Sequence, residues 1–176
     1  SDLWVFNPLK CELTVRRPTS NANGEDSPWD ALKKVIESVI LSDCFTSVPK
    51  HAFSGYMALK SVQIPKSVAS IGNCAFVWCS LTSIKIPRSV ISFGGNPFFE
   101  CHHLKEIDIS ENPNFVFFDG MLMDREMTQI VYCPPSKSGD YSIPDTEATI
   151  CASAFRECGV LTSIRIPGTD GSHCVW

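Results

Sequence analysis

LTSIKIPRSVISFG, residues 81–94, decides the fold, because the chain repeats this pattern at a nearly fixed interval. Its first half returns as LTSIRIP at residues 161–167, and its second half is matched by SVASIG at residues 67–72. The aligned leucines Leu59, Leu81 and Leu104 are spaced by 81 − 59 = 22 and 104 − 81 = 23 residues. A unit of this length cannot bury its apolar face alone, so successive copies are expected to stack into a solenoid.

Each copy contains the pattern L-x-x-[VI]-x-I, which predicts a short strand that is buried on one face. In residues 81–86 the apolar Ile84 and Ile86 flank the polar Lys85, and this alternation has the period of a strand. Further copies begin at Leu59, Leu104 and Leu161, and a weaker first copy covers residues 36–41. A proline without an N–H for the ladder ends three of these strands, at Pro65, Pro87 and Pro167.

A second set of apolar positions follows the last residue of each strand by seven residues. These positions are Val48, Ile71, Phe93 and Ile150. Glycine follows Ile71 and Phe93, where we expect a turn with a positive φ. An aromatic side chain is then expected to fill the interior of each coil, at Phe53, Phe76, Phe98 and Phe155.

The period breaks between residues 110 and 145. Asp119-Gly120 between two apolar runs is a strong signal for a β-hairpin. Met127-x-x-Ile130-x-Tyr132 is interpreted as a degenerate coil strand, and 161 − 127 = 34 then leaves 34 − 23 = 11 inserted residues in this coil. The composition of PPSKSGD, residues 134–140, predicts a loop.

The N-terminal part differs from the repeats and is expected to cap the solenoid, since an end coil otherwise exposes its core face. Residues 4–15 suit a capping hairpin, residues 16–28 a polar loop, and residues 29–40 a segment that starts as a helix. We expect a capping segment at residues 1–35, a solenoid at 36–167 with an insert at 112–145, and a C-terminal tail or truncated repeat at 168–176.

Composition narrows the possible functions. The 176 residues suit one domain, and 15 Lys and Arg against 19 Asp and Glu give a net charge of −4, which argues against a nucleic-acid partner. The longest apolar stretches, such as VIESVIL at residues 35–41, are interrupted by charge and far shorter than the roughly 20 residues of a membrane helix, so no membrane insertion is expected. The chain begins at Ser1 without a signal-peptide pattern, so we expect any export signal to have been removed.

Nine cysteines are present, and most are expected to be small buried side chains. Cys79, Cys101 and Cys158 share one repeat position and predict a buried ladder of free thiols with few, if any, disulfide bridges. Cys101-His102-His103 is the only Cys/His cluster in the sequence, but it lacks the spaced pairs of a zinc site. A Cys–His nucleophile pair is also not expected there, because a repeat cysteine points inward. No motif for catalysis or cofactor binding occurs, so no catalytic residue, cofactor or metal is predicted.

The repeats resemble the BspA-like leucine-rich repeats of bacterial and protozoan surface proteins. The segments that carry the resemblance are AFSGYMALKSVQIPKSVASIG (52–72), AFVWCSLTSIKIPRSV (75–90) and AFRECGVLTSIRIP (154–167), and the insert FFDGMLMDREMTQIVYCPPSKSGDYSIP (117–144) is also similar to one in that family. The resemblance implies a right-handed leucine-rich-repeat solenoid, α/β and horseshoe-like, with a parallel sheet of short strands, short helical turns and one hairpin insert. It also implies a secreted or surface-displayed protein used for attachment, with no catalytic residues to carry over.

The outward positions of the strands form the candidate binding surface, which we call the strand face. Its candidate protein-binding residues are Lys60, Gln63, Thr82, Lys85, Lys105, Asp108 and Arg165. The expected partner is a host or extracellular protein, bound by an extracellular or cell-surface chain that is a monomer or part of a longer surface protein. Two alternatives stay open: a structural spacer that presents another domain, and a cysteine-dependent hydrolase. Tyr56 and Trp78 are the aromatic residues of the turns, and Trp78 is expected to pack against the body.

Overall fold

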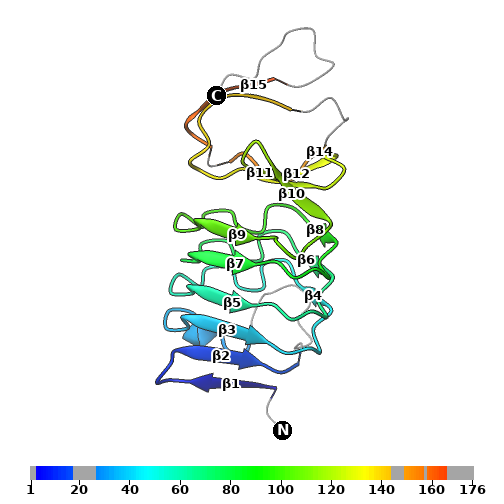
Figure 1. Cartoon of the computed structure of the whole chain (residues 1–176). Helices are drawn as coiled ribbons and strands as arrows, with labels where there is room; N and C mark the ends of the chain where they lie inside the picture. The colour runs from blue at the N-terminus through cyan, green and yellow to red at the C-terminus, as the bar shows by residue number, and fades with distance from the viewer. Residues whose placement is uncertain (1–2, 18–26, 144–148, 157, 166–176) are drawn as a thin grey trace.

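The computed structural model describes residues 3–17, 27–143, 149–156 and 158–165. In these residues the chain winds into a solenoid whose short strands stack from the N-terminal to the C-terminal end (Figure 1). Pro167, the tail at residues 168–176 and most of the predicted polar loop lie outside the described residues.

The first sheet begins with the predicted capping hairpin, which is confirmed. Strands β1 (Trp4–Asn7) and β2 (Glu12–Val15) pair antiparallel, and β2 then pairs in parallel with β3 (Ser38–Leu41). The next strand is β5 (Ser61–Gln63), in which Ser61 lies opposite Ser38, an offset of 61 − 38 = 23 residues. Each copy of the repeat is therefore the packing partner of the next, and the weak first copy is a true rung.

The same side continues with β7 (Ser83–Lys85) and β9 (Glu106–Asp108), which pair in parallel with the same offset, 106 − 83 = 23. Between β5 and β7 the ladder is interrupted. No ladder pairs these two strands, and beside them a backbone hydrogen bond runs from Thr82 N to Lys60 O at 3.4 Å. This seam divides the side into a sheet β1-β2-β3-β5 and a sheet β7-β9.

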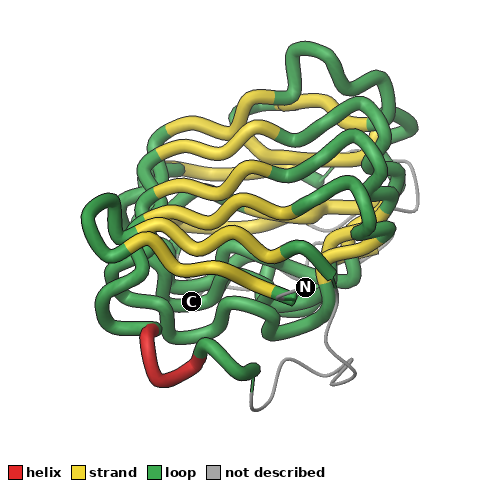
Figure 2. Tube along the Cα trace, turned by 90° about the horizontal axis from the view of Figure 1, so that it is seen from below, coloured by secondary structure: helices red, strands yellow, loops and turns green. Residues whose placement is uncertain are grey.

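A second sheet forms at the other apolar positions of the repeat. It consists of β4 (Ser47–Val48), β6 (Ser70–Ile71) and β8 (Ser92–Phe93), which are parallel, with Val48, Ile71 and Phe93 in one row. Figure 2 shows the strands of successive coils running nearly parallel to one another. The predicted second row of apolar residues is confirmed for these three coils.

The turn glycines do not have the predicted positive φ. Gly72 and Gly94 both lie outside the left-handed region. The reason for glycine is instead the close approach of neighbouring coils, because a Cβ on Gly72 would lie 2.7 Å from the Cα atom of Lys50.

Helix is nearly absent from the described residues, so the predicted short helical turns are wrong. The only helix there is the 3₁₀ helix η1 (Asp30–Leu32), in the segment where the sequence favoured a helical start. The other connections use hydrogen-bonded turns and the two-residue strands of the second sheet. No helix in this part of the chain has the length and apolar character needed to cross a membrane.

The insert contains the predicted hairpin. Strands β10 (Phe115–Phe118) and β11 (Met121–Asp124) pair antiparallel around Asp119-Gly120, whose φ values are 46° and 78°. Both values are positive, as a two-residue type I′ turn requires. Strand β12 (Gln129–Tyr132) then pairs antiparallel with β11.

The interpretation of Met127-x-x-Ile130-x-Tyr132 as the degenerate coil strand one coil before Leu161, with 11 inserted residues, is wrong. Strand β12 pairs in parallel with β14 (Thr149–Ile150), while β15 (Leu161–Arg165) pairs with β13 (Gly139–Ser142). Tyr141 lies opposite Ile164, so the offset 164 − 141 = 23 is the ordinary period. Tyr141 and Ile143 are buried and alternate with polar residues, a strand signal that the composition of PPSKSGD obscured.

A single apolar core runs through the coils. Phe53, Phe76 and Phe98 are buried and stack with ring centroids 5.8 and 6.1 Å apart, as the sequence predicts. Tyr132 continues this column, because its ring packs edge-on against Phe98 with the two centroids 5.7 Å apart. The fourth predicted aromatic, Phe155, is only partly buried and lies against Tyr141.

Candidate binding surface

The strand face is exposed, as expected for the outward positions of a sheet that is buried on its other side. Lys60, Gln63, Thr82, Lys85, Lys105 and Arg165 are exposed, and Asp108 is half-buried. Val131, between Ile130 and Tyr132 on β12, is fully buried because β12 does not join the row of outward strands.

The structure brings six of the seven predicted residues together and leaves one apart. Thr82 N contacts Lys60 O, and Lys105 N donates to Thr82 O at 3.0 Å, so these residues lie on successive coils. Gln63 and Lys85 line one groove, and Lys85 Nζ lies 3.9 Å from Asp108 Oδ2. Arg165 belongs to the separate sheet β13-β15.

Two of the predicted cations are already paired with neighbouring carboxylates. Lys60 Nζ lies 2.8 Å from Glu37 Oε2, and Lys85 Nζ lies 2.6 Å from Glu111 Oε1. The hydrogen bond between the two side chains raises the pKa of Lys85 and lowers the pKa of Glu111. Such exposed pairs contribute little to stability, but they leave the strand face nearly neutral at these positions.

At the C-terminal end of the strand face, hydroxyl groups surround one carboxylate. Thr162 Oγ1 and Ser163 Oγ each donate to Asp140 Oδ1 at 2.6 Å. Asp140 lies on β13, which the sequence interpretation treated as a loop, and the predicted Arg165 lies opposite Ser142 on the same pair of strands.

A groove of about 750 Å³ crosses several coils where the strands of the first sheet run into the next turn. Its charged and amide residues are Asp43, Gln63, Lys66, Lys85, Arg88 and Glu111. Sequence reasoning missed Lys66 and Arg88, because it considered only the strand positions. The signal was present in the repeat, since Asp43, Lys66, Arg88 and Glu111 recur at intervals of 23, 22 and 23 residues, each two residues after the last apolar position of a strand.

Of the two aromatic residues in the turns, Trp78 does not pack against the body as expected. The Trp78 side chain is 51% exposed, with a φ of 59° that bulky residues rarely adopt, so it does not pack into the body. Tyr56 is buried, and its hydroxyl donates to Asp30 Oδ1 at 2.6 Å, which ties the first coils to η1. Burial and the nearby Asp30 carboxylate raise the pKa of Tyr56 above its ordinary value.

The repeat cysteines point inward, as predicted, and Cys79 and Cys101 are not part of a disulfide. Cys79 Sγ donates to Phe53 O at 3.1 Å, and Cys101 Sγ donates to Phe76 O at 3.0 Å, so each thiol reaches back to a carbonyl of the preceding coil. Burial is the main cause that raises the pKa of Cys79. The predicted ladder of thiols is wrong for the third repeat cysteine, because Cys158 forms a disulfide with Cys133.

The disulfide follows from the same geometry as the thiol contacts. Cys101 reaches the residue that lies 101 − 76 = 25 positions earlier in the chain. For Cys158 that position is 158 − 25 = 133, and a cysteine stands there, with 6.6 Å between the two Cα atoms. This separation is within the usual range for a disulfide, so a bridge replaces the thiol–carbonyl contact.

The Cys/His cluster does not converge on one point. Cys101 is buried, whereas His102 and His103 are exposed, and His102 Nε2 lies 3.0 Å from Glu100 Oε2. Within the described ranges no group of three or more His, Cys, Asp or Glu side chains is placed to hold a metal ion.

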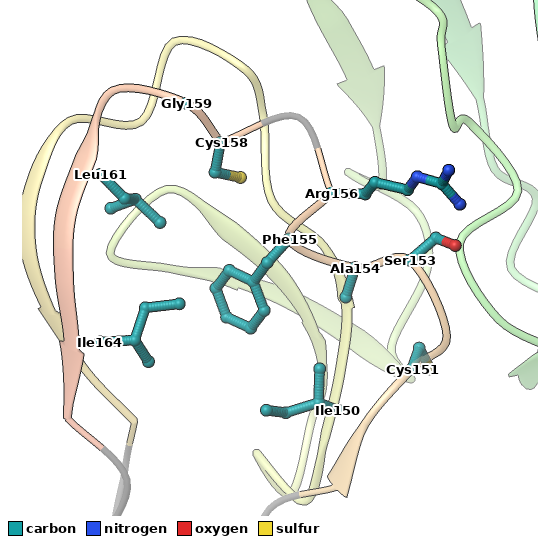
Figure 3. Close-up of a pocket in the computed structure, with 10 residues that line it drawn as sticks. All are labelled: Ile150, Cys151, Ser153, Ala154, Phe155, Arg156, Cys158, Gly159, Leu161 and Ile164. Carbon is teal, nitrogen blue, oxygen red and sulfur yellow. The ribbon is translucent and has the colours of Figure 1, made fainter. Parts of the chain in front are cut away.

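An apolar pocket of about 470 Å³ opens where the described part of the core ends. Figure 3 shows Phe155 at its centre, with Ile150, Leu161 and Ile164 around the ring. Arg156 points away from these groups, and its guanidinium carbon lies 4.8 Å from the Phe99 ring centroid. The pocket therefore lies on the core side of the last described coil, which is expected to be apolar in any solenoid.

Known structures contain the same architecture. A leucine-rich repeat protein from Eubacterium ventriosum is 20% identical over 93% of this chain and 57% of its own, with a TM-score of 0.58. A leucine-rich cell surface protein from Faecalibacterium prausnitzii is 28% identical over 76% of this chain and 36% of its own, with a TM-score of 0.62. The chain thus spans less than two thirds of the length of each of these two proteins.

A comparison with curated proteins finds no match in sequence. A comparison with models of protein families, in contrast, agrees with the structural result. The model of the BspA type leucine-rich repeat region matches residues 32–137 and 131–171 with six copies, which is most of the chain. With the repeat offset, the stacked strands and the aromatic column in place, the chain belongs to the BspA-type leucine-rich-repeat family.

Proposed function

We propose that the chain is a non-catalytic, surface-exposed module that binds host or extracellular-matrix proteins through the strand face. The observation that carries the proposal is the continuous exposed row of hydroxyl, amide and charged side chains across β5, β7 and β9. A protein partner is able to read such a row by hydrogen bonds and charge over several coils.

Two further observations support an extracellular setting. The similar protein from Faecalibacterium prausnitzii is a cell surface protein. The Cys133–Cys158 bridge also suits an oxidising environment, since disulfides are rare in reducing compartments.

The alternative of a cysteine-dependent hydrolase has less support. Cys79 and Cys101 are buried and contact backbone carbonyls, whereas a nucleophilic cysteine needs an accessible thiolate beside a base. A buried thiol whose pKa is raised is poorly suited to attack a substrate.

The test is capture of purified extracellular-matrix and host-surface proteins on an array. A triple charge reversal, Lys60→Glu, Lys85→Glu and Arg165→Glu, changes the strand face, and Lys10→Glu, Lys34→Glu and Lys50→Glu is a control of equal charge on exposed residues elsewhere. We expect the first variant to lose capture by about tenfold or more and the control to keep it. Equal capture by both variants would remove the strand face from the proposal, and no capture by any form would favour the spacer.

A further inference from the structure

The groove beside the strand face contains two cations that differ from the paired ones. Lys66 and Arg88 are exposed, occupy the same position in successive repeats, and line the groove together. Neither forms an ion pair with any residue in the described part of the chain. Lys60 and Lys85, in contrast, are neutralised by Glu37 and Glu111. The groove therefore contains two cations without an ion pair of their own among the described residues, although the charge of Lys66 also acts on the nearby Glu111 carboxylate.

The floor of the groove is apolar and lies at the interrupted seam of the sheet. Val62, Ile64, Pro65 and Pro87 line it, so a bound group also has apolar surface to cover. The seam between β5 and β7 passes through the same place, since the groove touches Gln63 on one strand and Lys85 on the other. The volume of about 750 Å³ is within the usual range for a ligand site, about 300–1,000 Å³.

The ends of the groove limit the kind of anion that fits. Asp43 belongs to the coil before Lys66, and Glu111 belongs to the coil after Arg88, where it pairs with Lys85 and also feels the charge of Lys66. An extended polyanion such as a sulfated glycan or a nucleic acid would pass both carboxylates and be repelled. A short acidic stretch of a protein, with one or two carboxylates between apolar residues, places few negative charges near Asp43 and Glu111 and still reaches the cations and the apolar lining.

We propose that this groove binds an acidic segment of the partner protein, with a Glu or Asp carboxylate held between Lys66 and Arg88. The guanidinium of Arg88 offers paired N–H donors to a carboxylate, and the Lys66 ammonium adds a second charge. Gln63 supplies an amide for the backbone of the segment. This inference rests on the proposed function, because it names the chemistry of a partner that the strand face would bind.

The experiment follows the backbone amide signals of the isotope-labelled chain by NMR during titration with three probes. The probes are the blocked peptide GELEG, its uncharged counterpart GQLQG, and a heparin-derived sulfated tetrasaccharide. The double variant Lys66→Ala/Arg88→Ala removes the two groove cations. The matched control Lys34→Ala/Lys50→Ala removes two exposed cations outside both the groove and the strand face.

The expected result is that GELEG shifts the amides of Lys66, Arg88 and their neighbours, and that GQLQG does not. The groove variant should bind GELEG about tenfold more weakly, and the control should bind it like the natural chain. Absence of shifts with GELEG, or equal affinity of the two double variants, overturns the proposal. Shifts in the groove with the tetrasaccharide alone overturn the assignment to an acidic protein segment.

The same variants separate this inference from the proposed function. On the protein array the groove variant should lose capture together with the strand-face reversal. Full capture by the groove variant, combined with lost capture by the strand-face reversal, would leave the binding function intact and refute the groove as its acidic-segment site.

Discussion

Phe76 is the middle ring of the stacked aromatic column, and its removal tests the packing that holds the coils together. The ring is fully buried, and the centroids of Phe53 and Phe98 lie 5.8 and 6.1 Å from its own. Burying a phenylalanine removes about 200 Å² from water, which at about 25 cal/mol per Å² gives an upper value of about 5 kcal/mol. Measured replacements of buried phenylalanine by alanine cost about 3–5 kcal/mol, so Phe76→Ala should lower the free energy of unfolding by that amount.

The assay is urea unfolding followed by circular dichroism, with Phe76→Leu and Ile91→Ala as comparisons. Leucine refills most of the space and should cost clearly less than alanine. Ile91 is 65% exposed, so Ile91→Ala should change the free energy of unfolding by less than about 0.5 kcal/mol. If Phe76→Ala costs no more than Ile91→Ala, the aromatic rings do not form a shared core and do not hold the stacked coils together.

Three further predictions follow from individual contacts. Cys133→Ser should destabilise the oxidised chain by about 3.5 kcal/mol, because the bridge spans 25 residues; urea unfolding measures this loss, and equal stability with and without a reductant in the natural chain would contradict it. Asn112→Ala should cost about 2 kcal/mol, because the buried Asn112 Nδ2 donates to Pro87 O at 2.6 Å and to a second carbonyl; a melting temperature unchanged from that of the natural chain would argue against this role. With iodoacetamide at pH 8 the exposed Cys44 should be labelled in the native state and Cys79 should not. The reason is that burial raises the pKa of Cys79, and the thiolate is absent well below that pKa. Mass spectrometry identifies the labelled cysteine, and labelling of both at one rate would mean that the Cys79 thiol is accessible.

Local sequence patterns were enough to predict the structural features that depend only on residues close together in the chain. Ile84 and Ile86 indicate a strand because their spacing of two residues places them on one side of an extended backbone, and every stacked copy repeats it. Asp119-Gly120 predicts its hairpin because few residues adopt two successive positive φ values. The outward strand positions were predicted from the same alternation, and the inward thiols from the repeat position that the cysteines share.

The candidate site was predicted only in part. Its strand residues could be read from the pattern, but Lys66 and Arg88 become a pair only when two coils stack and their turns line one groove. The charges of Lys60 and Lys85 are offset by carboxylates of neighbouring coils, and alternation within one strand does not reveal these ion pairs.

The sequence alone determined that this protein is a stack of repeated coils, because a 22- or 23-residue period with apolar residues on one side leaves each copy without a core of its own. Only the tertiary structure decided which strand of the insert pairs with the last repeat and which cysteine meets Cys158. The physical reason is that these choices depend on distances between residues that are remote in the chain. Once the insert interrupts the period, several registers satisfy the local pattern equally well, and packing around Tyr132 and Tyr141 selects one of them.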